Sequence, residues 1–182
     1  MLWNRAIASV KRQTFTDWEL IVVSDGPDLE FRQMPISIEE PISRWELPEH
    51  MGDWGATARR RGAAIAQGDI VAYLDDDNAW RPNHLMELVD AFKRHPAASF
   101  AYTQMRIMST GQVIGTDPPQ VGGIDSSVIA HVRGVLEIYG NWPDYVSYVQ
   151  DWETVERWMK NGARWVHIPM VTVDYYTDAR RQ

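Results

Sequence analysis

Three consecutive carboxylates, Asp75, Asp76 and Asp77, follow an apolar run from Ile70 to Leu74 in the stretch DIVAYLDDDNAW. Adjacent like charges repel one another, and aspartate is a poor strand former. Two acids that flank one residue can face the same point, so Asp75 and Asp77 could hold a divalent cation while Asp76 faces a hydroxyl group. Carboxylate oxygens in small number suit Mg²⁺ or Mn²⁺, which also bind substrate phosphates. The alternative is a solvated or helix-capping turn, and the triplet alone does not choose between the two.

Asp25 occupies a similar position after another apolar run. The run from Leu20 to Val23 ends in Ser24-Asp25-Gly26-Pro27, which is a strong turn signal. In open parallel sheets, ligands bind beyond the carboxyl ends of the strands. If both apolar runs are strands of one sheet, Asp25 and the acidic triplet are delivered to the same crevice.

The elements that must position these acids follow from the spacing of apolar residues. Strands and helices alternate in the first half, which predicts an α/β fold with a mainly parallel central sheet flanked by helices and a small antiparallel part in the second half. No repeat or linker interrupts the chain, so a single domain over 1–182 is expected. Helices are predicted over 1–13, 55–68, 81–96 and 149–162, strands over 20–23, 36–38, 70–74, 164–167 and 171–176, and a hairpin over 99–108 and 112–115.

Composition excludes several classes of function. The chain has 182 residues, a formal net charge of -7 and no cysteine. The negative charge disfavours nucleic acid as a partner, and the lack of cysteine excludes disulfides, thiolate zinc sites and thiol catalysis. The five histidines show no spacing suited to a shared metal. No apolar run reaches the roughly 18 to 20 residues of a transmembrane helix and no signal peptide opens the sequence, so a cytoplasmic protein without a transmembrane segment is expected.

Several motifs in order connect these acids to a known family. Gln13-Thr14, Asp25-Gly26, the Ala58-Arg59 pair with Gly62, and Asp75-x-Asp77 follow one another between residues 2 and 95. This order closely resembles family 2 glycosyltransferases of the GT-A fold. The resemblance implies transfer of a sugar from a nucleoside diphosphate sugar, with UDP the commonest carrier, to an unknown acceptor. It also implies a nucleotide-binding half over 1–95 and an acceptor-binding half over 96–182.

The resemblance assigns a role to each acid of the first half. Asp25 is expected to read the nucleotide base, and Asp76 to lie near the ribose. Arg59 matches an arginine near the base and phosphates, and the alternative is a cation on the helix surface. Asp77 is the expected direct metal ligand with Asp75 in support, so that Mn²⁺ or Mg²⁺ bridges the two phosphates and stabilises the leaving nucleoside diphosphate.

The same resemblance places a catalytic base in YVQDWETVERW, where Asp151 opens a predicted helix. A helix N-terminus favours a negative charge, which suits the base of an inverting displacement. Aspartate is also a favoured helix cap, so capping is the alternative role. Gln150 replaces the acid that usually precedes the base. Glu153 is the second choice, and Asp125 resembles a position on the acceptor side.

The sequence departs from the family at its start. Family members begin with a buried strand that contacts the base, whereas this sequence begins at the helix that follows it. A misplaced start, a strand supplied by another segment or chain, or an adapted fold are the three explanations. An empty position would expose the backbone groups of two neighbouring strands, weaken nucleotide binding and favour a homo-oligomer. The alternative function is therefore a truncated, catalytically silent GT-A domain that acts as a binding or assembly module. A nucleotidyltransferase or phosphotransferase is less supported, because no Walker-type phosphate loop is present.

Overall fold

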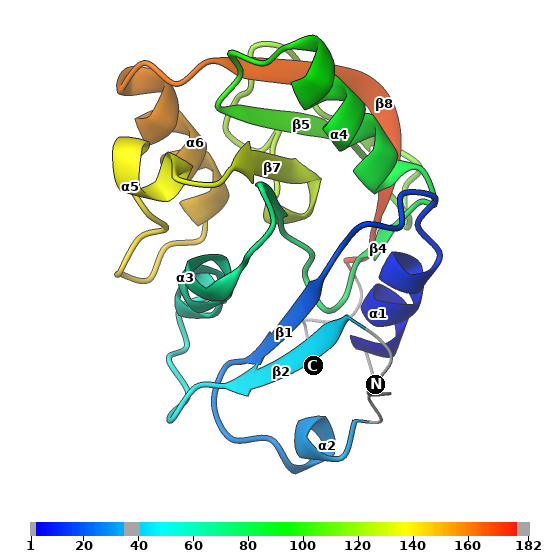
Figure 1. Ribbon diagram of the computed structural model, residues 1–182, viewed down its shortest axis with the longest axis vertical. Helices are drawn as coiled ribbons and strands as arrows, with labels where there is room; N and C mark the ends of the chain where they lie inside the picture. Colours follow the sequence, from blue (N-terminus) through cyan, green and yellow to red (C-terminus); the bar gives the residue numbers. More distant parts are fainter. Residues whose placement is uncertain (1–2, 35–40, 178–182) are drawn as a thin grey trace.

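A computed structural model describes residues 3–34 and 41–177. Helices and strands alternate along the first half, as predicted, and the second half adds antiparallel strands (Figure 1). In chain order the elements are α1 (Trp3–Lys11), β1 (Leu20–Ser24), α2 (Leu29–Arg32), β2 (Ile42–Glu46), α3 (Ala56–Ile65), β3 (Ile70–Ala72), β4 (Ala79–Trp80), α4 (His84–Arg94), β5 (Phe100–Ile107), β6 (Val113–Ile114), the 3-10 helix η1 (Ser126–Val128), β7 (Ile129–Val132), α5 (Val135–Tyr139), α6 (Gln150–Lys160) and β8 (Trp165–Tyr175).

The strands of the described residues form two sheets. The smaller sheet is the parallel pair β1–β2, and the larger has the order β3-β7-β5-β8-β4 with β6 added beside β5. Only β5 and β8 run parallel in the larger sheet, while β3–β7, β5–β7, β5–β6 and β4–β8 are antiparallel. The α/β class is confirmed, but the sheet is mixed rather than mainly parallel.

The two apolar runs that precede the acids lie in different sheets. β1 pairs with β2 in the register Leu20↔Ile42, whereas β3 pairs with β7 in the register Ile70↔Val132. The expectation that one sheet carries both runs is therefore wrong for the described residues. Within the described residues β1 pairs with β2 alone, so no strand connects it to the larger sheet. The prolines around β2 hid this strand in the sequence. The strand expected over 36–38 lies outside the described residues.

The core lies between the larger sheet and the helices of the second half. It is rich in aromatic side chains, and Phe100, Tyr102, Trp142 and Trp158 are fully or almost fully buried in it. α4 contacts β5 and β8, while α5 and α6 lie at one end of the larger sheet (Figure 1). This packing fixes α6, which carries Asp151, relative to the sheet that carries the acidic triplet.

The last strand differs from its prediction. A single strand, β8, replaces the two strands expected over 164–167 and 171–176. Pairing with β5 shifts between Tyr102↔His167 and Gln104↔Val171, so β8 carries extra residues at this point. Pro169 lies in this bulge, where the missing N–H of proline removes no regular ladder bond. The hairpin of β5 and β6 is confirmed.

Candidate functional site

Arg59 is the centre of a cluster of charged groups. Its side chain is only 10% exposed, and the guanidinium Nη2 donates to Asp75 Oδ1 at 2.6 Å and to Ser126 Oγ at 2.9 Å. Burial by itself lowers the pKa of Arg59, but the charges of Asp75, Asp151 and Asp125 outweigh burial and hold this pKa above its ordinary value. Arg59 is therefore not a cation on the helix surface.

The acidic triplet is divided by burial. Asp75 is half-buried, Asp76 is exposed and Asp77 is buried. The Asp75 carboxylate also accepts a hydrogen bond from Ser126 Oγ at 3.1 Å, so η1 helps to orient it. The backbone turns here, since Asn78 N donates to Asp75 O at 3.1 Å. A turn that buries Asp77 and pairs Asp75 with a buried cation is not an ordinary solvated turn.

Asp125 lies beside the same cluster and has an unusual protonation state. Its carboxylate accepts from Ser127 N at 2.9 Å, which caps η1. Burial, followed by the negative charges of Asp75 and Asp151, raises the pKa of Asp125 to about 8. Asp125 therefore carries a proton at neutral pH in the folded chain. The sequence singled out this residue only through its resemblance to an acceptor-side position.

Asp151 approaches the cluster from α6. The helix begins at Gln150, and its N-cap is Val149, whose side chain makes no capping hydrogen bond. Asp151 is in the first turn rather than at the cap, so the capping role is wrong. The helix N-terminus stabilises its negative charge. Glu153, two residues later in the same first turn, accepts from Tyr145 Oη at 3.2 Å.

Asp25 is bound to a different segment. Its carboxylate accepts from Met51 N at 2.9 Å and from Gly52 N at 3.2 Å, and His50 Nδ1 lies 3.0 Å from Oδ2. Gly26 makes this approach possible, because its φ is 99° and a Cβ there would lie 2.8 Å from His50 N. The contacts of Asp25 thus lead to residues 50–52 and not directly to the acidic triplet.

The loop from Met51 to Gly55 joins Asp25 to the Arg59 cluster. Two residues after Gly52, Trp54 O accepts from Arg59 Nη1 at 3.0 Å and from Gln150 Nε2 at 2.8 Å. Sequence reasoning missed this loop and the two serines of η1. The only local signal was Gly52-Asp53-Trp54-Gly55, a bulky residue enclosed by turn formers.

The acids fit a divalent cation only together with a ligand. No group of three or more histidine, aspartate or glutamate side chains that could hold a metal ion is present within 3–34 and 41–177. Asp75 and Asp77 supply hard oxygen donors, and Mg²⁺ or Mn²⁺ usually completes its shell with water and substrate phosphates instead of an all-protein cage. The donor set is therefore compatible with an ion that arrives with a diphosphate.

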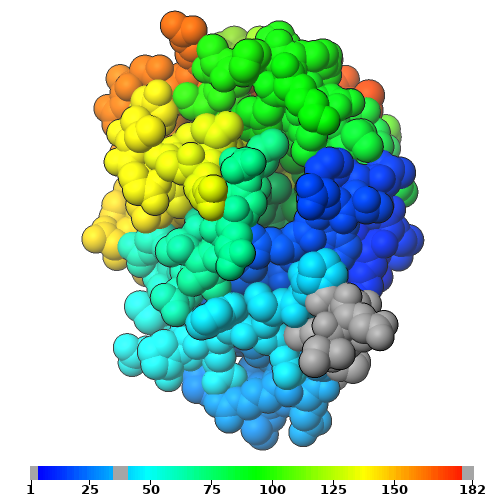
Figure 2. Space-filling view, in the orientation of Figure 1, coloured from blue at the N-terminus to red at the C-terminus, as the bar shows by residue number. Residues whose placement is uncertain are grey.

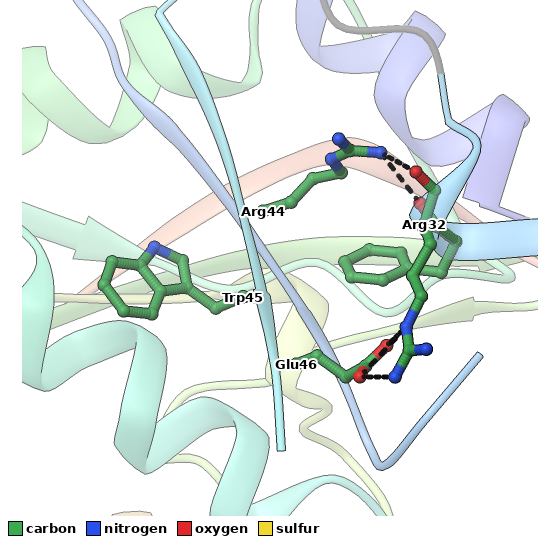
Figure 3. Close-up of a pocket in the computed structure, with 5 residues that line it drawn as sticks. Arg32, Arg44, Trp45 and Glu46 are labelled. Atoms are coloured by element: carbon green, nitrogen blue, oxygen red, sulfur yellow. Dashed lines mark hydrogen bonds and ion pairs between the residues drawn. The ribbon is translucent and has the colours of Figure 1, made fainter. Parts of the chain in front are cut away.

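A shallow surface pocket lies away from this cluster, between α2 and β2. It is lined by Phe31, Arg32, Arg44, Trp45 and Glu46 (Figure 3). Arg32 pairs with Glu46, and Arg44 Nη1 donates to the carbonyl oxygens of Phe31 and Arg32 at 3.1 and 2.6 Å. Both guanidinium groups thus already hold α2 against β2, which gives the pocket a structural role.

The family model described as Glycosyl transferase family 2 matches residues 4–146. The chain belongs to this family. Among its curated relatives, an uncharacterized glycosyltransferase of Nostoc sp. is 34% identical over 91 residues, which are 50% of this chain and 28% of the relative. The UDP-Glc:alpha-D-GlcNAc-diphosphoundecaprenol beta-1,3-glucosyltransferase WfgD of Escherichia coli is 29% identical over 113 residues, which are 62% of this chain and 44% of the relative. The chain thus spans less than half of the length of these two relatives.

Solved structures confirm the GT-A fold of this family 2 chain. S. aureus TarS 1-349 in complex with UDP-GlcNAc superposes with a TM-score of 0.78 at 15% identity, over 98% of this chain and 56% of that one. The mannosyltransferase PcManGT of Pyrobaculum calidifontis, in complex with GDP-Man and Mn²⁺, superposes with a TM-score of 0.76 at 19% identity, over 98% of this chain and 54% of that one. In the part of the family 2 chain that the structure describes, the helices are all too short or too polar to cross a membrane.

Proposed function

We propose that this family 2 chain transfers a sugar from a nucleoside diphosphate sugar to a hydroxyl group of an acceptor, with inversion at the anomeric carbon. One observation carries the proposal. Acidic side chains from three distant parts of the sequence meet at the buried guanidinium of Arg59: Asp75 pairs with it at 2.6 Å, and Asp125 and Asp151 also help to raise its pKa. Burying charges is costly unless they are paired, and concentrated charge of this kind is typical of a catalytic site.

Asp151 is the proposed base. Its carboxylate takes the proton as the acceptor O–H bond breaks, and the acceptor oxygen forms a bond to the anomeric carbon from the face opposite the leaving group. The bond between that carbon and the diphosphate oxygen breaks, and its electron pair leaves with the nucleoside diphosphate. Asp125, with a pKa of about 8, keeps its proton at neutral pH, so it adds no second negative charge beside the base.

We place the nucleoside diphosphate sugar on the side of the cluster opposite Asp151. Asp25 accepts from the imide N–H of the base, since each carboxylate oxygen that already binds a backbone N–H has a second lone pair. Asp76, the exposed member of the triplet, faces the ribose. Arg59 serves the donor end through Asp75, which it holds in place. In this proposal the nucleotide occupies the half over 1–95, and the acceptor occupies the half over 96–182 of one domain.

Asp77 and Asp75 would hold Mn²⁺ or Mg²⁺ that enters with the diphosphate. When bound, such an ion neutralises charge on the phosphate oxygens of the leaving group. The structure of PcManGT with Mn²⁺ and a nucleotide sugar supports this part of the proposal. We favour a UDP-sugar as donor, and GDP is the second carrier to test because neighbours of both kinds are known.

The decisive experiment measures the melting temperature with UDP or GDP, in the presence and absence of Mn²⁺. We expect one nucleotide with Mn²⁺ to raise the melting temperature, and Asp77→Asn, which keeps the shape of the side chain, to remove most of the rise. Release of UDP from a panel of UDP-sugars then reports turnover, which Asp151→Asn should abolish while nucleotide binding persists. No shift with either nucleotide would overturn the proposal.

One observation favours the second candidate, a silent GT-A domain that serves as a binding or assembly module. Every residue of β1 is only half-buried although Leu20 to Val23 are apolar, and the strand pairs with β2 alone within the described chain. A strand of this composition is normally covered on both faces and both edges. Self-association without nucleotide binding or turnover would support this candidate.

A further inference from the structure

Trp54 has an unusual backbone conformation. Its φ is 56°, and it is the only residue other than glycine with a positive φ in the described part of the chain. For a bulky side chain this conformation costs energy and persists only where the surroundings enforce it. Gly52 and Gly55, with φ of 62° and 83°, flank Trp54 and let the chain make this turn. The strained position therefore needs an explanation in its surroundings.

Two side chains from the candidate site hold Trp54. Its carbonyl oxygen accepts from Arg59 Nη1 at 3.0 Å and from Gln150 Nε2 at 2.8 Å. Gln150 is buried, and its Oε1 has no hydrogen-bond partner among the described residues. The side-chain amide of Gln150 is therefore held by the hydrogen bond from Nε2 to Trp54 O. One clamp comes from the residue that pairs with Asp75 and the other from the residue before Asp151. The position of Trp54 thus depends on the residue that pairs with Asp75 and on the helix that carries Asp151.

The ring of Trp54 meets a second exposed aromatic ring. Trp54 is 42% exposed and Tyr148 is 85% exposed, and their ring centroids lie 5.1 Å apart with an interplanar angle of 52°. Tyr148 precedes α6 by two residues, so this loop and the strained turn present their rings together beside the helix that carries Asp151. Exposed aromatic surface that is held in a strained turn is typical of a binding surface and not of a core.

We propose that Trp54 and Tyr148 form a platform on which a pyranose ring of the acceptor stacks. One face of a pyranose carries C–H groups that pack on the electron-rich face of an aromatic ring, while its hydroxyl groups remain at the edge. The platform belongs to the acceptor because Tyr148 lies two residues before α6, and Gln150 of α6 holds the Trp54 carbonyl. Both rings therefore lie near the start of the helix that carries the proposed base Asp151. This inference rests on the proposed function, and it names the acceptor as a carbohydrate.

The test follows the Trp54 ring directly, with the protein labelled by 5-fluorotryptophan. The fluorine resonance of Trp54 is assigned by its loss in Trp54→Gly, since glycine adopts a positive φ without strain. Methyl pyranosides, maltose, cellobiose and chitobiose are titrated with and without UDP and Mn²⁺. We expect at least one sugar to shift the Trp54 resonance. Tyr148→Ala should lower the affinity for this sugar by about tenfold. Tyr148→Phe, which keeps the ring, should bind like the wild type.

Trp45→Ala is the matched control, because Trp45 has the same exposure of 42% but lies on β2. This substitution should leave sugar affinity and the melting-temperature shift with UDP unchanged. A Trp54 resonance that no sugar moves, while UDP still binds, would overturn the platform and leave the proposed function standing. A resonance that UDP alone moves, with weaker UDP binding in Tyr148→Ala, would assign the rings to the nucleotide base and also overturn it. If neither UDP nor GDP binds, the proposed function fails, and the sugar titration without nucleotide still decides the platform.

Discussion

At the scale of single residues, the Arg59 side chain connects several separate segments of the site. Its guanidinium holds the Asp75 carboxylate, the Ser126 hydroxyl and the Trp54 carbonyl at once. A planar group with five donors can make these bonds in different directions, which an ammonium group on a flexible stem cannot do. The acidic triplet, η1 and the strained turn therefore depend on one side chain.

We predict that Arg59→Ala lowers the free energy of unfolding by about 3–5 kcal/mol, because it leaves the half-buried Asp75 without its charge partner. Urea unfolding followed by circular dichroism measures this loss. Arg61→Ala is the control, since Arg61 is an exposed residue of the same helix and its loss should change the free energy of unfolding by about 0.5 kcal/mol or less. Equal stability of the two variants would show that Arg59 does not organise the site.

The raised pKa of Asp125 predicts how stability depends on pH. The folded chain keeps this proton up to a pH of about 8, whereas the unfolded chain loses it near pH 4. Between these values the folded state binds more protons than the unfolded state, so the contribution of Asp125 to stability decreases as the pH rises. Relative to Asp125→Asn, which stays neutral at every pH, the urea midpoint of the wild type should fall from pH 5 to pH 8. A constant difference between the two proteins would contradict the raised pKa.

At the scale of elements, the junction between β1 and the loop at residues 50–52 sets the position of Asp25. Gly26 allows the close approach, since its φ is 99° and His50 N is 2.8 Å from the position of a Cβ. Asp25 binds the backbone N–H groups of Met51 and Gly52, and Trp54 follows two residues later. One glycine at the end of β1 thus determines the path of the loop that reaches Arg59.

We predict that Gly26→Ala lowers the melting temperature more than Gly111→Ala does. Gly111 has a φ of 76° and no atom within 4 Å of its Cβ position, so both substitutions add backbone strain but only Gly26→Ala adds a clash with backbone atoms. Strain alone costs on the order of 1 kcal/mol, and the clash in Gly26→Ala adds to it. UDP binding, measured by thermal shift, should weaken only in Gly26→Ala. A larger loss in Gly111→Ala would refute this account of the β1 junction.

The same scale shows which elements the sequence could predict. α4 and α6 carry apolar residues at helical spacing, and β5 and β6 flank a Ser-Thr-Gly turn, so local pattern was sufficient. β2, β4 and β7 were missed, the first two for different reasons. β2 lies in a segment with many prolines and has exposed residues at its centre, and β4 has only two residues. The bulge in β8 that accommodates Pro169 depends on pairing with β5 and has no local signature.

At the scale of the whole molecule, the two sheets divide the chain into regions. In the space-filling view the first fifty residues, drawn in blue and cyan, gather at one end, and the second half, from green to orange, covers the other (Figure 2). α3 and the segment after it lie between the two regions. The charged cluster is assembled at this meeting point, because Arg59 comes from α3, Asp75 from the turn after β3, Asp125 from the cap of η1 and Asp151 from α6.

The small sheet leads to a prediction about association. We expect this chain to self-associate through β1, because its apolar residues are half-exposed and β2 is its only strand partner among the described residues. Sedimentation velocity should show a sedimentation coefficient that rises with concentration. Hydrogen exchange should slow at the β1 amides over the same range, with β8 amides unchanged as the internal control. A monomer at all concentrations would contradict this expectation.

The sequence by itself determined the family, the α/β class and most helices, because these depend on motif order and on periodicity within short windows. It also placed Asp25, Asp75 and Asp151 at the ends of elements and Arg59 on a helix, where they could act. Only the tertiary structure decided that β1 and β3 lie in different sheets, that Arg59 gathers Asp75, Asp125 and Asp151, and that Trp54 meets Tyr148. The physical reason is that burial and charge act between residues far apart in the chain, so no local pattern records them.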